Sequence, residues 1–86
     1  MNGKIALRAP ENIADYISAD EIADIEKTTL RVGYGCRIYY VGHGTWQAVI
    51  LDRDDVPLLT KKIREKNGAP GGWSIKTYPV QDWEVA

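Results

Sequence analysis

The amino-acid sequence predicts an α+β fold, because a β-hairpin lies in mid-chain and helix-like segments stand on both sides of it. Two runs rich in β-branched and aromatic residues, 36–41 and 45–51, flank the tripeptide Gly42-His43-Gly44. Glycines at both ends of a short connection supply the positive φ angles of a tight turn. With 86 residues, of which 44% are hydrophobic and 27% charged, the chain is expected to form one domain, residues 1–86, around one core.

Side-chain alternation divides the hairpin into two faces. The face expected to meet the core carries Ile38, Tyr40, Trp46, Ala48 and Ile50. The opposite face, expected to be solvated or to contact a partner, carries Arg37, Tyr39, Gln47 and Val49.

The segment before the hairpin predicts a strand followed by helix. Residues 4–8 alternate polar and apolar side chains, and Pro10 suits the entry to a helix. Apolar residues with helical spacing follow, but their phase shifts near Ser18, where Ser18 and Glu21 have the spacing of a capping box. We therefore expect two short helices meeting near Ser18, or one helix kinked there. Residues 28–34 have β-like composition and predict a strand that leads into the hairpin.

After the hairpin, aspartates 52, 54 and 55 with Pro57 predict a helix start, and the helix is expected to run to Lys66. Val56, Leu59 and Ile63 would share one face of it. Residues 69–72 predict a loop, and residues 73–78 predict a final strand that ends, or lies at an edge, near Pro79.

The predicted order is thus β-α-(α)-β-β-α-β, an antiparallel sheet with helices on one face. It matches the split βαβ arrangement of ferredoxin-like domains. The alternative keeps the same elements but gives residues 30–34 a strand of their own.

The composition excludes several classes of site. The net charge of −1 offers no general attraction to nucleic acid or to an anionic membrane. One cysteine and one histidine permit neither an intrachain disulfide nor a zinc set, so no metal and no cofactor is predicted. The sequence shows no signal peptide and no stretch of about 18 apolar residues, so we expect a cytoplasmic protein.

Two residues have side chains suited to catalysis, but their positions in the sequence do not indicate a catalytic site. His43 lies at a turn tip, where an exposed turn residue is the simpler interpretation than a general base that needs an orienting partner. Cys36 begins a strand, where a small buried hydrophobe is the simpler interpretation than a nucleophile.

Charge is segregated along the chain, which allows three interpretations. Residues 11–26 contain six acids and no base, whereas residues 61–66 contain four bases and one acid. The segments are either solvated helix faces, or an acidic helical surface that docks into a basic, nucleic-acid-type groove of a partner, or a basic cluster that contacts phosphates. The predicted protein-binding residues are Glu11, Asp15, Asp20, Glu21, Asp24, Trp73 and Trp83, with the tryptophans as interface anchors. The alternative nucleic-acid-binding residues are Arg37, Tyr39, Lys61, Lys62, Arg64 and Lys66.

Residues 30–40, Leu-Arg-Val-Gly-Tyr-Gly-Cys-Arg-Ile-Tyr-Tyr, resemble the central strand pair of RelE-type ribonuclease toxins. The resemblance implies a small toxin ribonuclease as a further alternative. The chain departs from that family in its acidic helical segment, its net charge, the strand expected after its last helix, and a spacing around Cys36 that is two residues shorter. No catalytic role is carried over to any residue.

The sequence thus favours a non-enzymatic protein that acts by protein–protein contact, such as a regulator or inhibitor. A nucleic-acid-binding domain is the alternative. A homodimer is possible through an exposed edge strand near Pro79.

Overall fold

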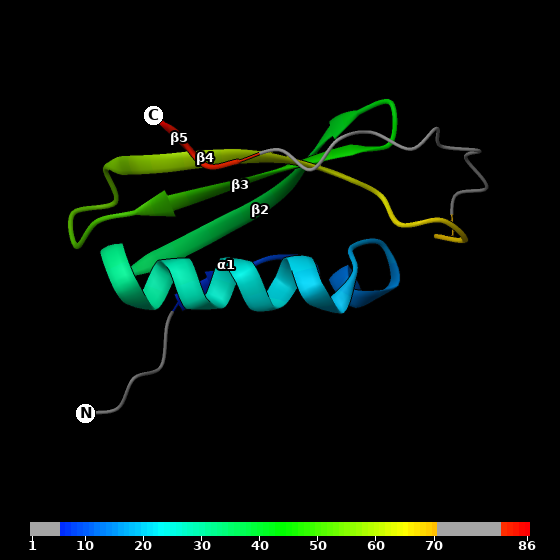
Figure 1. The fold of residues 1–86 in the computed structure, drawn as a ribbon, viewed down its shortest axis with the longest axis horizontal. Helices are drawn as coiled ribbons and strands as arrows, with labels where there is room; N and C mark the ends of the chain where they lie inside the picture. Colours follow the sequence, from blue (N-terminus) through cyan, green and yellow to red (C-terminus); the bar gives the residue numbers. More distant parts are fainter. Residues whose placement is uncertain (1–5, 71–81) are drawn as a thin grey trace.

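A computed structural model of the chain describes residues 6–70 and 82–86 and is a small α+β structure (Figure 1). Its elements are the strand β1 (Ala6–Arg8), the 3-10 turn η1 (Ile13–Asp15), the helix α1 (Ala19–Val32), and the strands β2 (Gly35–Gly42), β3 (Thr45–Leu51), β4 (Pro57–Arg64) and β5 (Glu84–Val85). The Cα radius of gyration is 12.8 Å.

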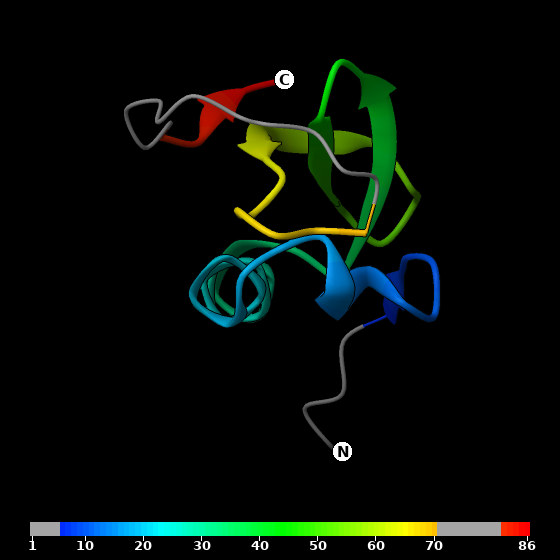
Figure 2. The same cartoon turned by 90° about the vertical axis from the view of Figure 1, so that its right-hand side faces the viewer.

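The five strands form one sheet in the order β1-β2-β3-β4-β5. β1 pairs with β2 in parallel and the other neighbours are antiparallel, so the sheet is mixed rather than antiparallel as predicted. The parallel pair arises because η1 and α1 connect β1 to β2, and a crossover of that length returns the chain in the same direction. Figure 2 shows α1 end-on below the sheet, so the molecule has two layers and the opposite sheet face carries no helix among the described residues.

The β2–β3 hairpin confirms the mid-chain prediction and its two faces. Tyr40 pairs with Trp46 and Ile38 with Ala48, which places these side chains on one face. The turn has positive φ at all three of its residues, 104° at Gly42, 54° at His43 and 70° at Gly44. The Tyr40 hydroxyl accepts a hydrogen bond of 2.9 Å from the Gly44 amide, so a side chain of the inner face also holds the turn.

Helix α1 begins where the capping box predicts, but it extends into the segment that was predicted to be a strand. The Ser18 hydroxyl accepts a hydrogen bond of 3.3 Å from the Glu21 amide. The predicted strand over residues 28–34 is wrong, because α1 continues to Val32. Thr28 and Thr29 are buried, and the Thr29 hydroxyl donates 2.6 Å to the Ile25 carbonyl. The helix thus buries two β-branched residues whose intrinsic preference favours a strand, and it gives the Thr29 hydroxyl a hydrogen-bond acceptor.

Only one α-helix lies in residues 6–70 and 82–86. The prediction of two short helices meeting near Ser18, or of one helix kinked there, is corrected to the 3-10 turn η1 followed by α1. The helix ends at Gly33, whose amide donates 2.9 Å to the Thr29 carbonyl. A Cβ at Gly33 would lie 2.4 Å from Ile50 Cγ2, so α1 can approach β3 this closely only at a glycine.

The predicted helix that starts within residues 52–57 and runs to Lys66 is also wrong, since residues 57–64 form β4. Asp52 does not cap a helix. Its carboxylate accepts hydrogen bonds from the amides of Asp54 (2.8 Å) and Val56 (2.9 Å), and Asp55 takes a φ of 62°. These contacts make the β3–β4 connection a turn stabilised by an aspartate side chain. The ferredoxin-like order requires a helix in the part of the chain that forms β4, so this order is not found.

The core lies between α1 and the sheet. Its buried members are Ile13, Ile17, Ile25, Cys36, Ile38, Trp46, Ala48, Ile50 and Ile63. Ala69 and Pro70 of the predicted loop follow β4, whereas the rest of that loop, the predicted strand 73–78 and Pro79 lie outside the described residues. The tail of the chain supplies β5, which pairs Leu59 with Val85.

Candidate functional site

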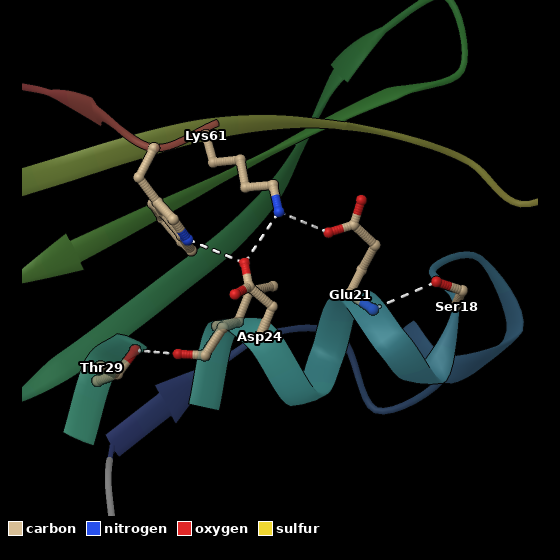
Figure 3. A network of polar contacts seen from close by, with 7 residues as sticks. Ser18, Glu21, Asp24, Thr29 and Lys61 are labelled. Carbon is tan, nitrogen blue, oxygen red and sulfur yellow. Dashed lines mark hydrogen bonds and ion pairs between the residues drawn. The ribbon is translucent and has the colours of Figure 1, made fainter. Parts of the chain in front are cut away.

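A buried lysine on β4 meets two carboxylates of α1 (Figure 3). Lys61 points inward on the core face of β4, and its Nζ donates 2.8 Å to Glu21 Oε1 and 2.9 Å to Asp24 Oδ2. The Lys61 side chain is 5% exposed, whereas those of Glu21 and Asp24 are 25% and 39% exposed. The two carboxylates are therefore partly hydrated, whereas the buried ammonium relies on them for its hydrogen bonds and counter-charge.

Electrostatic interactions favour the charged forms of Asp24 and Lys61. Burial alone would raise the pKa of Asp24, but hydrogen bonds from Lys61 and Trp83 and the positive charge of Lys61 outweigh it and lower that pKa. Burial alone would lower the pKa of Lys61, but hydrogen bonds to Glu21 and Asp24 and their negative charges outweigh it and raise that pKa. The two shifts share one cause, the approach of opposite charges across the layers, and the hydrogen bond from Trp83 adds to the lowering at Asp24.

Trp83 joins the same group from the far end of the chain. Its Nε1 donates 2.9 Å to Asp24 Oδ2, and its ring centroid lies 5.6 Å from Lys61 Nζ, within the range of a cation–π contact. Pairing of β5 with β4 holds the backbone, and the Ala86 amide donates 3.1 Å to the Leu58 carbonyl. Trp83 is half-buried, so part of its indole remains accessible.

These residues line a pocket of about 450 Å³ beside α1, which we call the acidic pocket. Its lining residues are Ser18, Asp20, Glu21, Asp24, Lys61, Asp82 and Trp83. The lining thus contains four carboxylates and one ammonium, so the pocket has a net negative charge. Four of the predicted protein-binding residues, Asp20, Glu21, Asp24 and Trp83, come together here.

The other predicted protein-binding residues do not line this pocket. Glu11 and Asp15 are exposed around η1, on the chain just before α1. Trp73 lies outside the described residues. We call the acidic pocket, at the first turns of α1, together with the exposed carboxylates of Glu11 and Asp15 the acidic side of the molecule.

The predicted nucleic-acid-binding residues are divided between the two faces of the sheet. Arg37 and Tyr39 are exposed on β2 and Lys62 on β4, and Gln47 lies between Tyr39 and Lys62 in the strand register. Lys61 lies on the opposite face, in the contacts above. Arg64 Nη1 donates 3.3 Å to the His43 carbonyl. Lys66, beyond the end of β4, uses its Nζ to donate 2.7 Å to the Ala14 carbonyl.

The structural role of Lys61 was missed because a lysine at that position predicts a solvated surface. The signal was alternation: Leu59, Lys61, Ile63 and Glu65 follow one another at every second residue. Leu59, Lys61 and Ile63 of β4 turn toward the helix layer, and Lys61, Ile63 and Glu65, which follows the strand, are buried. Glu65, which no sequence prediction used, is only 6% exposed.

The two residues with catalytic chemistry are placed as expected. His43 is exposed at the tip of the β2–β3 turn. Cys36 is 1% exposed, and burial, opposed by hydrogen bonds from Val49 and Thr29, raises the pKa of its thiol to about 11. Such a thiol is a poor nucleophile near neutral pH, because the thiolate is the reactive form.

In residues 6–70 and 82–86, no group of three or more His, Cys, Asp and Glu side chains is arranged to hold a metal ion. No helix in this part of the chain is both long enough and apolar enough to cross a lipid bilayer. Comparison of the chain with protein-family models, with curated proteins and with solved structures finds no match.

Proposed function

We propose that this is a cytoplasmic, non-enzymatic protein that regulates or inhibits a larger protein by binding it through the acidic side of the molecule. The observation that carries the proposal is the acidic pocket, whose lining includes the four carboxylates of Asp20, Glu21, Asp24 and Asp82, the single ammonium of Lys61 and a half-buried Trp83. The exposed carboxylates of Glu11 and Asp15 extend the same charge beyond the pocket.

The geometry suits recognition of a basic surface. Lys61 holds Glu21 and Asp24 in place, so these carboxylates lose little conformational freedom when a partner binds. Exposed carboxylates such as Asp20 steer a basic partner during encounter. The accessible part of Trp83 offers the aromatic anchor that interfaces favour. A groove that normally holds nucleic acid presents the lysines and arginines that such a surface would complement.

The test is a pull-down from nuclease-treated host lysate, with the retained proteins identified by mass spectrometry and binding then measured with the purified partner. The variant Asp15→Asn/Asp20→Asn removes two exposed carboxylates of the acidic side. The variant Asp54→Asn/Glu84→Gln makes the same change in net charge away from it and is the matched control.

The first variant is expected to weaken binding by about three- to tenfold, mainly through slower association, and the control to leave it unchanged. Added salt should reduce the difference. Recovery of no protein partner after nuclease treatment, or equal binding by the two variants, would reject the proposal.

A second candidate function is nucleic-acid binding by the sheet face opposite α1, and one observation favours it. Arg37, Tyr39 and Lys62 are all exposed on that face. Strand pairing places Lys62 of β4 in the same row as Tyr39 of β2, with Gln47 of β3 between them. A tyrosine on the same face as two cations can stack a base while the cations contact phosphates.

Its test is a salt titration of single-stranded RNA binding by the wild type and by Arg37→Gln/Lys62→Gln. Each phosphate contact should contribute about −0.7 to the slope of log K against log salt, so the double variant should reduce the slope by about 1.4. Absence of binding at low salt would exclude this function.

A further inference from the structure

Three aromatic side chains enclose a second pocket at the turn end of the hairpin. Trp46 of β3 packs against Tyr40 of β2, with ring centroids 5.2 Å apart and planes at 63°. Tyr16, which follows η1, packs against the same indole at 5.4 Å and 42°. The resulting pocket, which we call the aromatic pocket, measures about 400 Å³. It is lined by Pro10, Asn12, Tyr16, Tyr40, Trp46, Glu65 and Pro70.

A carboxylate with an unused oxygen lies in the wall of the aromatic pocket. Glu65 follows β4, is 6% exposed, and accepts a hydrogen bond of 3.2 Å from Trp46 Nε1 at its Oε1. Its Oε2 is buried and has no hydrogen-bond partner among the described residues. A buried carboxylate oxygen without a donor is unfavourable, and a cation beside it removes that penalty.

We propose that the aromatic pocket binds a guanidinium group, with an aromatic ring against its plane and the Glu65 carboxylate turning so that Oε2, buried in the free protein, faces the pocket and accepts its N–H. Aromatic rings attract cations at their faces, and a guanidinium ion stacks on them more readily than other cations because it is planar and weakly hydrated. The same ion supplies the donor that Oε2 lacks. The proposal rests on residues outside the acidic pocket and does not depend on the proposed function.

Other ligand classes fit the pocket less well. A quaternary ammonium ion satisfies the rings but has no N–H for the carboxylate. An anion would be repelled by Glu65, and a neutral apolar ligand would leave Oε2 unpaired. Tetramethylammonium is therefore the informative competitor, because it keeps the charge and removes the donors.

The experiment is an NMR titration of the full chain, following the indole N–H of Trp46, which already contacts Glu65. The probes are methylguanidinium, tetramethylammonium and the blocked tripeptide Gly-Arg-Gly. The variant Glu65→Gln removes the charge but can still accept the Trp46 hydrogen bond. Glu26→Gln, at an exposed position of α1 outside both pockets, is the matched control.

Methylguanidinium is expected to shift the Trp46 signal saturably, with at least about tenfold weaker binding in Glu65→Gln and unchanged binding in Glu26→Gln. If Glu65→Gln fails to fold, Tyr16→Leu, which removes one ring of the pocket, is expected to weaken binding as well. Tighter binding of the tripeptide would identify an arginine of a polypeptide as the source of the group, and equal binding a free guanidinium compound.

The proposal is overturned if neither methylguanidinium nor the tripeptide gives a saturable shift. It is also overturned if tetramethylammonium binds as tightly as methylguanidinium, or if the two glutamine variants bind equally. Binding to the aromatic pocket that survives in Asp15→Asn/Asp20→Asn would separate this site from the acidic side of the molecule, whatever the outcome for the protein partner.

Discussion

The contact between Lys61 and the carboxylates of α1 predicts an asymmetric response to mutation. The Lys61 side chain is 5% exposed, but Glu21 and Asp24 keep 25% and 39% of their side-chain surface. Replacing Lys61 by methionine leaves two carboxylates that can turn to water, and an apolar chain of similar length in the buried position. Removing both carboxylate charges instead leaves an ammonium buried without a counter-charge.

The magnitudes follow from this difference in exposure. An unpaired buried charge destabilises a protein by about 3–5 kcal/mol, and we expect Glu21→Gln/Asp24→Asn to lower the free energy of unfolding by that amount. For Lys61→Met we expect a loss of about 1–2 kcal/mol, because the lost hydrogen bonds are partly replaced by water at the carboxylates. Lys62→Met, at the exposed neighbouring position, should change stability by no more than about 0.5 kcal/mol.

Urea unfolding followed by circular dichroism measures these differences at constant pH and salt. A triple variant that combines Lys61→Met with the two carboxylate changes should be less destabilised than the sum of its parts, since the groups interact directly. A larger loss for Lys61→Met than for Glu21→Gln/Asp24→Asn, or no loss for either, would refute the assignment of Lys61 as the buried member of the group.

Further predictions concern the helix ends, the thiol and the response to acid. Gly33→Ala should destabilise the fold by about 1–3 kcal/mol in the same unfolding assay, because its Cβ would meet Ile50 Cγ2 at 2.4 Å. Ser18→Ala should remove about 1 kcal/mol through loss of the N-cap of α1, and Ser18→Asp should restore most of it. Cys36 should react with a disulfide reagent rapidly in the unfolded chain but slowly in the native one, and rapid native reaction would contradict its burial. The lowered pKa of Asp24 contributes stability that is complete above its unfolded value of 3.8 and is lost as the pH falls through the folded value, so Asp24→Asn should flatten the acid limb of the stability curve.

The elements that depend on local chemistry could be predicted from the amino-acid sequence. Gly42 and Gly44 supply the positive φ angles of the hairpin turn, and alternation along the flanking strands separates Ile38 from Arg37. The hydroxyl of Ser18 caps α1 at the residue where the capping box places it. In each case the interacting groups lie within a few residues of one another, so the pattern is complete in the sequence.

The identity of β4 and the composition of the two pockets depend instead on contacts between residues far apart in the chain. The spacing of Leu59 and Ile63 is compatible with one helix face and also with one strand face, and an inward lysine between them hides the strand pattern. Lys61 can be buried there because Glu21 and Asp24, about 40 residues earlier in the chain, neutralise its charge across the layers. Contacts between residues so far apart leave no periodic pattern in the sequence. For the same reason, the sequence did not predict the contacts between Glu65 and its aromatic neighbours.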